Sequence, residues 1–204
     1  MFHDTKEKLS LIITALILIS ILLVAQRYAS IFQYGRAAIM AGEYWRIITC
    51  HFVHSGWEHL TLNVIGAVLL FGLFVNLYSP FVWLMGALCC MIGISLSFLI
   101  FCVNLEWYNG LSGVLHAVFL MGCIGEIKNG NMFYCFGLLG IIGKLVMDRF
   151  AGPSEFTSQF TETLVATAAH LSGIISGGVT GCIIIYMQNL SPGQSSGAVT
   201  EAAA

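Results

Sequence analysis

Long apolar runs separated by short polar segments make up most of this chain. Each run is close to the length of helix that crosses about 30 Å of hydrocarbon, so we expect six membrane-spanning helices packed as an all-α bundle. The runs cover approximately Leu9–Gln26, His59–Leu77, Phe81–Val103, Leu111–Ile127, Met132–Met147 and Thr163–Met187. Proline and Asn-Gly breaks separate several of them, as is typical of turns.

The polar stretches fix the domain organisation. Residues 1–188 are expected to form one membrane domain, which includes a long polar and aromatic loop between the first two runs. The tail, residues 189–204, is rich in Ser, Gly and Ala and is expected to be disordered. No small-residue cleavage site follows the first run, so we interpret that run as a retained helix rather than a signal peptide.

Composition agrees with a lipid environment. The chain is 58% hydrophobic and only 9% charged, with a mean hydropathy of +0.88. Eight Lys and Arg residues against ten Asp and Glu give a formal net charge of −2. We therefore expect no basic surface that would bind nucleic acid. We expect the protein to lie in the lipid bilayer.

The seven cysteines form no C-x-x-C pair. All but Cys50 lie in apolar runs, where we expect small buried thiols rather than disulfides or a metal centre. The full set is Cys50, Cys89, Cys90, Cys102, Cys123, Cys135 and Cys182.

Three of the runs carry polar side chains on a single helical face. Such groups are costly at membrane depth and usually face the bundle interior or a water-filled cavity. They are His59 and Asn63 in the second run, Ser112 and His116 in the fourth, and His170 with Gly173, Gly177 and Gly181 in the sixth. Glycines at this spacing allow a neighbouring helix to approach closely. The glycine-flanked start of the fourth run is the best-suited partner, which would bring Ser112 within hydrogen-bonding reach of His170.

This pairing predicts a serine nucleophile with a histidine base. A serine hydroxyl needs a base to accept its proton, and neutral imidazole is the usual one. His59 and Asn63 offer two donors for a developing oxyanion. The chain has only two aspartates, Asp4 and Asp148, and neither lies in an apolar run near these groups. We therefore expect a dyad rather than a Ser-His-Asp triad.

Other interpretations of the same residues remain open. Each polar group taken alone is more typical of a hydrogen bond between helices than of catalysis. Their occurrence on three different helices, two of them with small-residue faces, is what favours a shared site. The stretch from Cys50 through His51 and His54 to His59 raises the possibility of a metal site, although its spacing does not stack on one helical face. A transporter would use polar residues as a permeation path, but no intramembrane carboxylates or internal repeat are visible.

Three stretches resemble, in order and spacing, the signatures of the rhomboid family of intramembrane serine proteases. They are "EYWRIITCHFVHSGWEHLTLNVIG", "NGLSGVLHAVFLMG" and "AHLSGIISGG". The matching motifs are Trp45-Arg46, His59 with Asn63, the G-x-S-G from Gly110 to Gly113, and Ala169-His170.

The resemblance implies a six-helix bundle without metal or other cofactor. It implies Ser112 as nucleophile, His170 as general base, and His59, Asn63 and the Ser112 N–H as the oxyanion hole. Trp45 and Arg46 would brace the first loop. The active site would open toward the periplasm, in a multi-pass protein of the inner membrane, and the substrates would be membrane-anchored proteins.

One departure points to a subgroup. His116 stands where many rhomboids carry a tyrosine that stacks on the catalytic histidine, and this resembles the rhombosortases. That subgroup is associated with proteins bearing a C-terminal Gly-Gly motif, an apolar helix and a basic end. We interpret His116 as a ring that orients His170; a second base or a further donor are the alternatives.

Two functional alternatives stay beside this one. The first is a general rhomboid protease without sorting-tail specificity, and the second is an inactive relative that binds membrane clients; the presence of both Ser112 and His170 disfavours the second. The glycine-rich "FGLLGIIGK" segment of the fifth run suggests a mobile gate for lateral substrate entry.

Overall fold

The structure is a computed structural model that describes residues 5–150 and 163–190. Within these ranges it is mostly helical, and six helices have 17 residues or more. They are α1 (Thr5–Gln26), α5 (Trp57–Phe74), α6 (Pro80–Phe101), α7 (Ser112–Lys128), α8 (Tyr134–Phe150) and α10 (Thr163–Leu190). The shorter elements are α2 (Ala29–Phe32), β1 (Tyr34–Gly35), α3 (Arg36–Met40), α4 (Arg46–Thr49), η1 (Cys50–Phe52) and β2 (Trp107–Tyr108).

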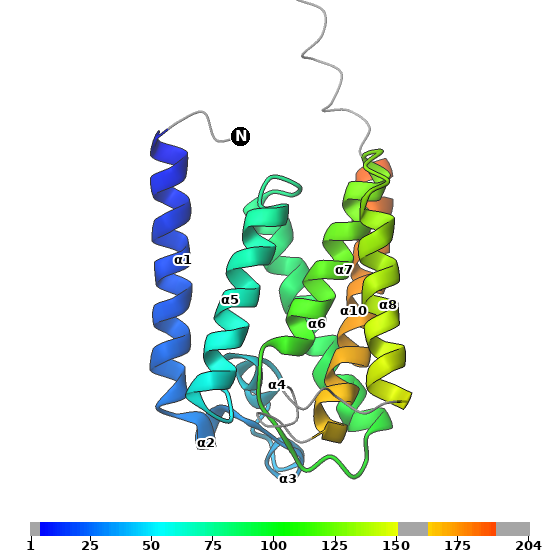
Figure 1. Ribbon diagram of the computed structural model, residues 1–204. Coiled ribbons are helices and arrows are strands. Elements are labelled where there is room, and N and C mark those ends of the chain that lie inside the picture. Colours follow the sequence, from blue (N-terminus) through cyan, green and yellow to red (C-terminus); the bar gives the residue numbers. More distant parts are fainter. Residues whose placement is uncertain (1–4, 151–162, 191–204) are drawn as a thin grey trace, which may run out of the picture.

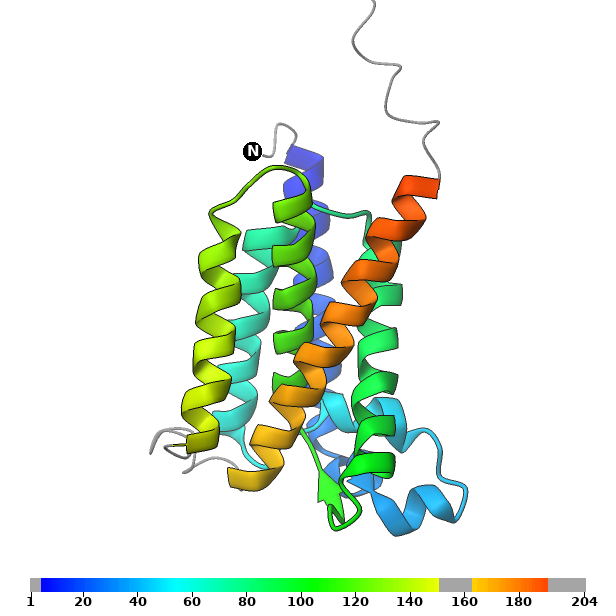
Figure 2. The same cartoon turned by 90° about the vertical axis from the view of Figure 1, so that its right-hand side faces the viewer.

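The long helices stand side by side, and the short elements gather at one end of them (Figures 1 and 2). The start of α1 and the end of α10 lie at the opposite end. At the end with the short elements, β1 and β2 pair antiparallel, with Tyr34 opposite Tyr108. This ladder ties the long first loop to the segment that leads into α7.

Arg36 fastens the same end to α6. Its guanidinium donates to backbone carbonyls at and just after the C-terminus of that helix, where intrahelical hydrogen bonding ends. The acceptors are the carbonyls of Phe98, Leu99, Cys102 and Leu105.

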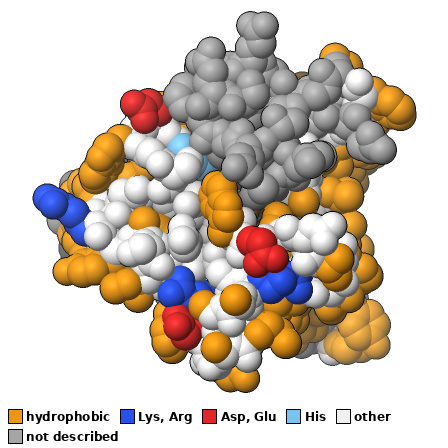
Figure 3. Space-filling model, turned by 90° about the horizontal axis from the view of Figure 1, so that it is seen from below, with side chains coloured by type: hydrophobic (Ala, Val, Ile, Leu, Met, Phe, Trp, Pro, Cys, Tyr) orange, Lys and Arg blue, Asp and Glu red, His pale blue; other side chains and the backbone are white. Residues whose placement is uncertain are grey.

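Three helices in the described part are long and apolar enough to cross a membrane: α5, α6 and residues Thr167–Leu190 of α10. Many of their large apolar side chains are exposed, including Leu69, Ile100 and Ile175, as expected where lipid replaces water. At the end with the short elements, charged side chains are scattered between apolar ones and backbone, and apolar side chains occupy much of the margin (Figure 3).

The closest helix packing joins α7 to α10 through glycines. A Cβ added to Gly173 would overlap the carbonyl of Gly113, and one added to Gly177 would overlap the backbone of Ala117. A Cβ on Gly113 would lie 2.9 Å from the Ala169 carbonyl oxygen. The glycine stripe of the sixth run therefore packs against the start of the fourth, as its spacing predicts.

The helix positions predicted from the apolar runs agree with the long helices within a few residues. The prediction of an all-helical fold missed the β1–β2 ladder. A strand of two residues is too short to show a hydrophobic periodicity in the sequence. α10 includes Asn189 and Leu190, the first two residues assigned to the tail. The rest of the tail and the loop at 151–162 lie outside the described residues.

The cysteines differ from the expectation. Cys50, in the first loop, is fully buried, whereas Cys89 and Cys182 are exposed on helices α6 and α10. An apolar run does not distinguish a side chain that packs inside the bundle from one that faces lipid. Cys89 and Cys182 lie on outward faces of the bundle. All seven thiols are free.

The glycine contact predicts a difference between two adjacent residues. Gly177→Ala should destabilise the protein by about 1–3 kcal/mol, because its Cβ meets backbone that cannot rotate away. Gly178→Ala should have little effect, since its Cβ would only approach the Leu120 side chain at 3.4 Å. Thermal unfolding in detergent tests this, and equal melting temperatures for the two variants would contradict it.

Candidate active site

Ser112 is the first residue of α7, and the segment before it is held by three hydrogen bonds. Gly110, at φ 132°, donates its N–H to the Cys50 carbonyl at 3.0 Å. The Leu111 N–H donates to His54 Nε2 at 3.3 Å, and the Tyr108 hydroxyl donates to the Gly110 carbonyl at 2.6 Å. The predicted nucleophile thus follows a firmly anchored turn.

His170 lies on α10 directly after Ala169, whose carbonyl meets Gly113, and it is 5% exposed. The His116 ring stacks on it, with ring centroids 4.0 Å apart and an interplanar angle of 17°. His116 Nδ1 lies 2.8 Å from the Ser112 carbonyl oxygen. Because a carbonyl only accepts, Nδ1 of His116 carries the proton.

The backbone contact brings the Ser112 and His170 positions onto facing helices. Among the contacts of the described residues, however, there is no hydrogen bond between Ser112 Oγ and the His170 ring. His170 Nδ1 instead lies 3.5 Å from Lys144 Nζ of α8. A lysine ammonium can only donate, so this contact engages the Nδ1 lone pair and leaves Nε2 to carry the ring proton.

His59 and Asn63 share the buried face of α5 that meets the nucleophile segment. The His59 ring lies against Gly110, where an added Cβ would be 2.8 Å from its Cε1 atom. His59 Nδ1 is 3.2 Å from Ser55 Oγ, and Asn63 Nδ2 donates to the His59 carbonyl at 3.0 Å. Both side chains are almost fully buried.

Trp45 and Arg46 lie apart from this group, at the start of α4. Arg46 forms a 2.7 Å salt bridge with Glu43 and donates to the carbonyls of Ser30 and Gln33. Trp45 Nε1 donates to the Ile31 carbonyl at 3.4 Å. These contacts fasten α4 to α2.

Two further histidines of the first loop are buried behind the nucleophile segment. His51 Nε2 lies 3.1 Å from the Met91 carbonyl oxygen, and burial lowers the pKa of His51 to about 4. Burial, assisted by the neighbouring His59, lowers the pKa of His54 to about 3. Within the described ranges, no group of three or more His, Cys, Asp or Glu side chains is placed to hold a metal ion.

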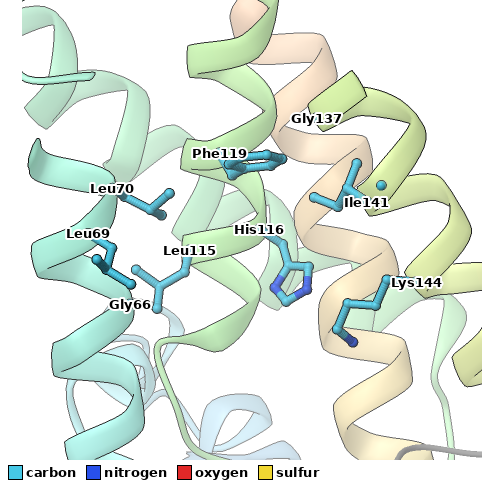
Figure 4. Close-up of a pocket in the computed structure, with 10 residues that line it drawn as sticks. Gly66, Leu69, Leu70, Leu115, His116, Phe119, Gly137, Ile141 and Lys144 are labelled. Carbon is cyan, nitrogen blue, oxygen red and sulfur yellow. The ribbon is translucent and has the colours of Figure 1, made fainter. Parts of the chain in front are cut away.

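A cavity of about 440 Å³ lies between α5, α7 and α8. Its lining is mostly apolar, and His116 and Lys144 lie together toward the end where α7 begins (Figure 4). Leu70, Phe119 and Ile141 line the apolar part. The cavity therefore connects an apolar flank of the bundle with the neighbourhood of His170.

Lys144 and Tyr108 were not predicted to contact the site, and His54 was considered only as a possible metal ligand. A lysine within the apolar fifth run was a usable signal, because an intramembrane charge usually faces a cavity. Tyr108 and His54 reach the site through the β ladder and the loop fold, which helical periodicity cannot predict.

The Rhomboid domain model matches residues 41–187, which is most of the chain and includes every residue of the candidate site. The chain therefore belongs to the rhomboid family of intramembrane serine proteases, and it is a multi-pass membrane protein. A comparison with curated proteins gave no match.

The low pKa values of His51 and His54 predict acid sensitivity. Each histidine has a lower pKa in the folded state than the value of about 6.5 in the unfolded chain, so the fold is favoured while the ring is neutral. This contribution is complete above about pH 6.5 and is lost as the pH falls toward about 4 for His51 and about 3 for His54. The unfolding free energy should fall by about 1 kcal/mol per pH unit for each histidine in this window.

Melting temperatures from pH 7.5 to 4.5 in detergent measure this effect. His51→Gln removes one titrating group and should flatten the profile relative to wild type. If the melting temperature of this variant depended on pH as steeply as that of wild type, His51 would bind as many protons in the folded state as in the unfolded state.

Proposed function

We propose that this protein cleaves a peptide bond of membrane-anchored proteins with Ser112 as nucleophile and His170 as general base. The glycine contact between α7 and α10 supports this proposal most directly. It places the start of the serine-bearing helix against the Ala169–His170 backbone, with the His116 ring stacked on His170.

In the proposed reaction, Ser112 Oγ attacks the scissile carbonyl while His170 takes its proton. The new C–O bond turns the carbonyl into an oxyanion, which His59, Asn63 and the Ser112 N–H stabilise. The carbon–nitrogen bond then breaks, and His170 returns the proton to the leaving amine. Water, activated by the same histidine, releases the acyl group from Ser112.

The Lys144 contact must change before His170 can act in this way. In the proposed reaction Nε2 of His170 faces Ser112 and must present a lone pair, whereas a lysine ammonium beside Nδ1 favours the ring form with the proton on Nε2. Lys144 belongs to α8, which borders the cavity. Outward movement of α8 would admit an apolar substrate helix and also withdraw Lys144 from His170.

The finer features of the proposal rest on the sequence resemblance. All six long helices cross the inner membrane, and the end with the short elements faces the periplasm. The substrates are surface-destined or secreted proteins with a C-terminal Gly-Gly motif, an apolar helix and a basic end. His116 supports this subgroup, and its stacked ring orients His170. The alternatives are a general rhomboid protease and an inactive client-binding relative.

Cleavage of two reporters in cells tests the proposal. One carries the Gly-Gly, apolar-helix and basic tail, and the other is an ordinary rhomboid substrate. Wild type should cut the tailed reporter, and Ser112→Ala and His170→Ala should each lose at least about 10³-fold in rate, since both groups act in one step.

The outcomes separate the alternatives. Cleavage of only the ordinary substrate would retain the dyad and remove the sorting-tail specificity. Activity of Ser112→Ala equal to wild type, or binding of both reporters without cleavage, would favour the client-binding relative.

Filling the cavity should obstruct substrate entry without touching the chemistry. Gly140 lines the cavity, and a Cβ there meets nothing within 4 Å. Gly140→Leu should raise KM for the reporter severalfold and leave labelling of Ser112 by a small fluorophosphonate unchanged. Gly143→Leu is the matched control, because Gly143 is equally open but outside the cavity lining. Equal KM values for both variants would argue against entry between α5 and α8.

A further inference from the structure

The peptide group between Gly110 and Leu111 is held at both of its polar ends. Its carbonyl oxygen accepts the Tyr108 hydroxyl at 2.6 Å, and its N–H donates to His54 Nε2 at 3.3 Å. A peptide group is planar, so two partners on opposite sides prevent it from rotating. We refer to these two contacts as the peptide clamp.

The clamp acts where the backbone is otherwise most free to rotate. Gly110 has φ 132°, a conformation that glycine leaves easily because it has no Cβ. Rotation of this peptide group would turn the following backbone, including the Ser112 N–H that the proposed oxyanion hole needs. His59 packs against Gly110 on one side, and the Cys50 carbonyl accepts the Gly110 N–H. Neither contact fixes the orientation of the next peptide group.

Tyr108 is well placed to hold this carbonyl. It is 2% exposed and packs edge-on against Phe98 at 5.0 Å and His51 at 5.8 Å between ring centroids. Burial is the main cause that raises the pKa of Tyr108, while hydrogen bonding from the Gly113 backbone and the Ser112 side chain opposes it. The phenol therefore stays protonated, donates to Gly110, and presents its oxygen to the first turn of α7.

We propose that Tyr108 is a positioning residue for Ser112: its hydroxyl fixes the Gly110–Leu111 peptide group, and with it the nucleophile and the oxyanion-binding N–H. This inference rests on the proposed protease function. Tyr108 does not touch the substrate in this role. It acts on the reaction through Ser112 and the backbone that carries it.

The chain supplies a matched control in Tyr34, which pairs with Tyr108 across the β ladder. Tyr34 is fully buried and also packs edge-on against Phe98. Its hydroxyl has no hydrogen-bond partner among the described residues. Tyr34→Phe therefore removes a buried hydroxyl from the same cluster without removing an anchor of the nucleophile segment.

The experiment compares full-length wild type, Tyr108→Phe, Tyr34→Phe and Ser112→Ala in detergent. Four measurements are made: the rate of fluorophosphonate labelling, the steady-state kinetics (kcat and KM) for the tailed reporter, hydrogen exchange of the amides at 109–114, and the melting temperature. We expect Tyr108→Phe to label about tenfold more slowly and to lose about tenfold in kcat with KM unchanged, because a misplaced nucleophile slows reaction rather than binding. Its Leu111 amide should exchange at least about tenfold faster, and Tyr34→Phe should match wild type throughout.

Each contrary result has its own meaning. Equal labelling and exchange in the two tyrosine variants would overturn the positioning role. Equal slowing in both, together with equal losses in melting temperature, would overturn it too, since the hydroxyls would then matter only for general stability. If wild type is labelled no faster than Ser112→Ala, the protease function fails, and the positioning role fails with it whatever the exchange data show.

Discussion

The close approach of two helix backbones at Gly113, Gly173 and Gly177 is the contact on which the rest of the site depends. Side chains at these positions would overlap the facing backbone and force α7 and α10 apart. That separation would remove the His116–His170 stack, since its two rings come from these helices and lie 4.0 Å apart. In lipid there is no hydrophobic effect to press helices together, so such small-residue packing is what stabilises their association.

A second constraint lies at the end with the short elements. The first loop contributes Cys50 and His54, and the β ladder positions Tyr108; all three bind the backbone of Gly110 or Leu111. The first loop, which is distant in sequence, and the strand that directly precedes the turn thus converge on the backbone before Ser112. The burial of His51 and His54 in uncharged form is part of the same arrangement, because a protonated His54 ring could no longer accept the Leu111 N–H.

The opposite side of the site is less enclosed. The cavity between α5 and α8 is lined mainly by apolar side chains, and Lys144 brings a positive charge from α8 to His170. The closely packed pair of α7 and α10 therefore adjoins a helix that brings a charged side chain beside His170. Under the proposed function, α8 is the element whose outward movement would admit a substrate helix.

The sequence by itself determined the long helices and the face on which each polar residue lies. Apolar run length sets the helices, and a spacing of four residues places His59 with Asn63 and Ser112 with His116. It also predicted the partner of the glycine stripe, because small residues at that spacing have few other uses in a membrane helix. Only the tertiary structure revealed the contacts of Tyr108, His54 and Lys144 with the site. Those contacts depend on strand pairing, loop folding and the packing of α8 beside α7 and α10, and no local periodicity encodes them.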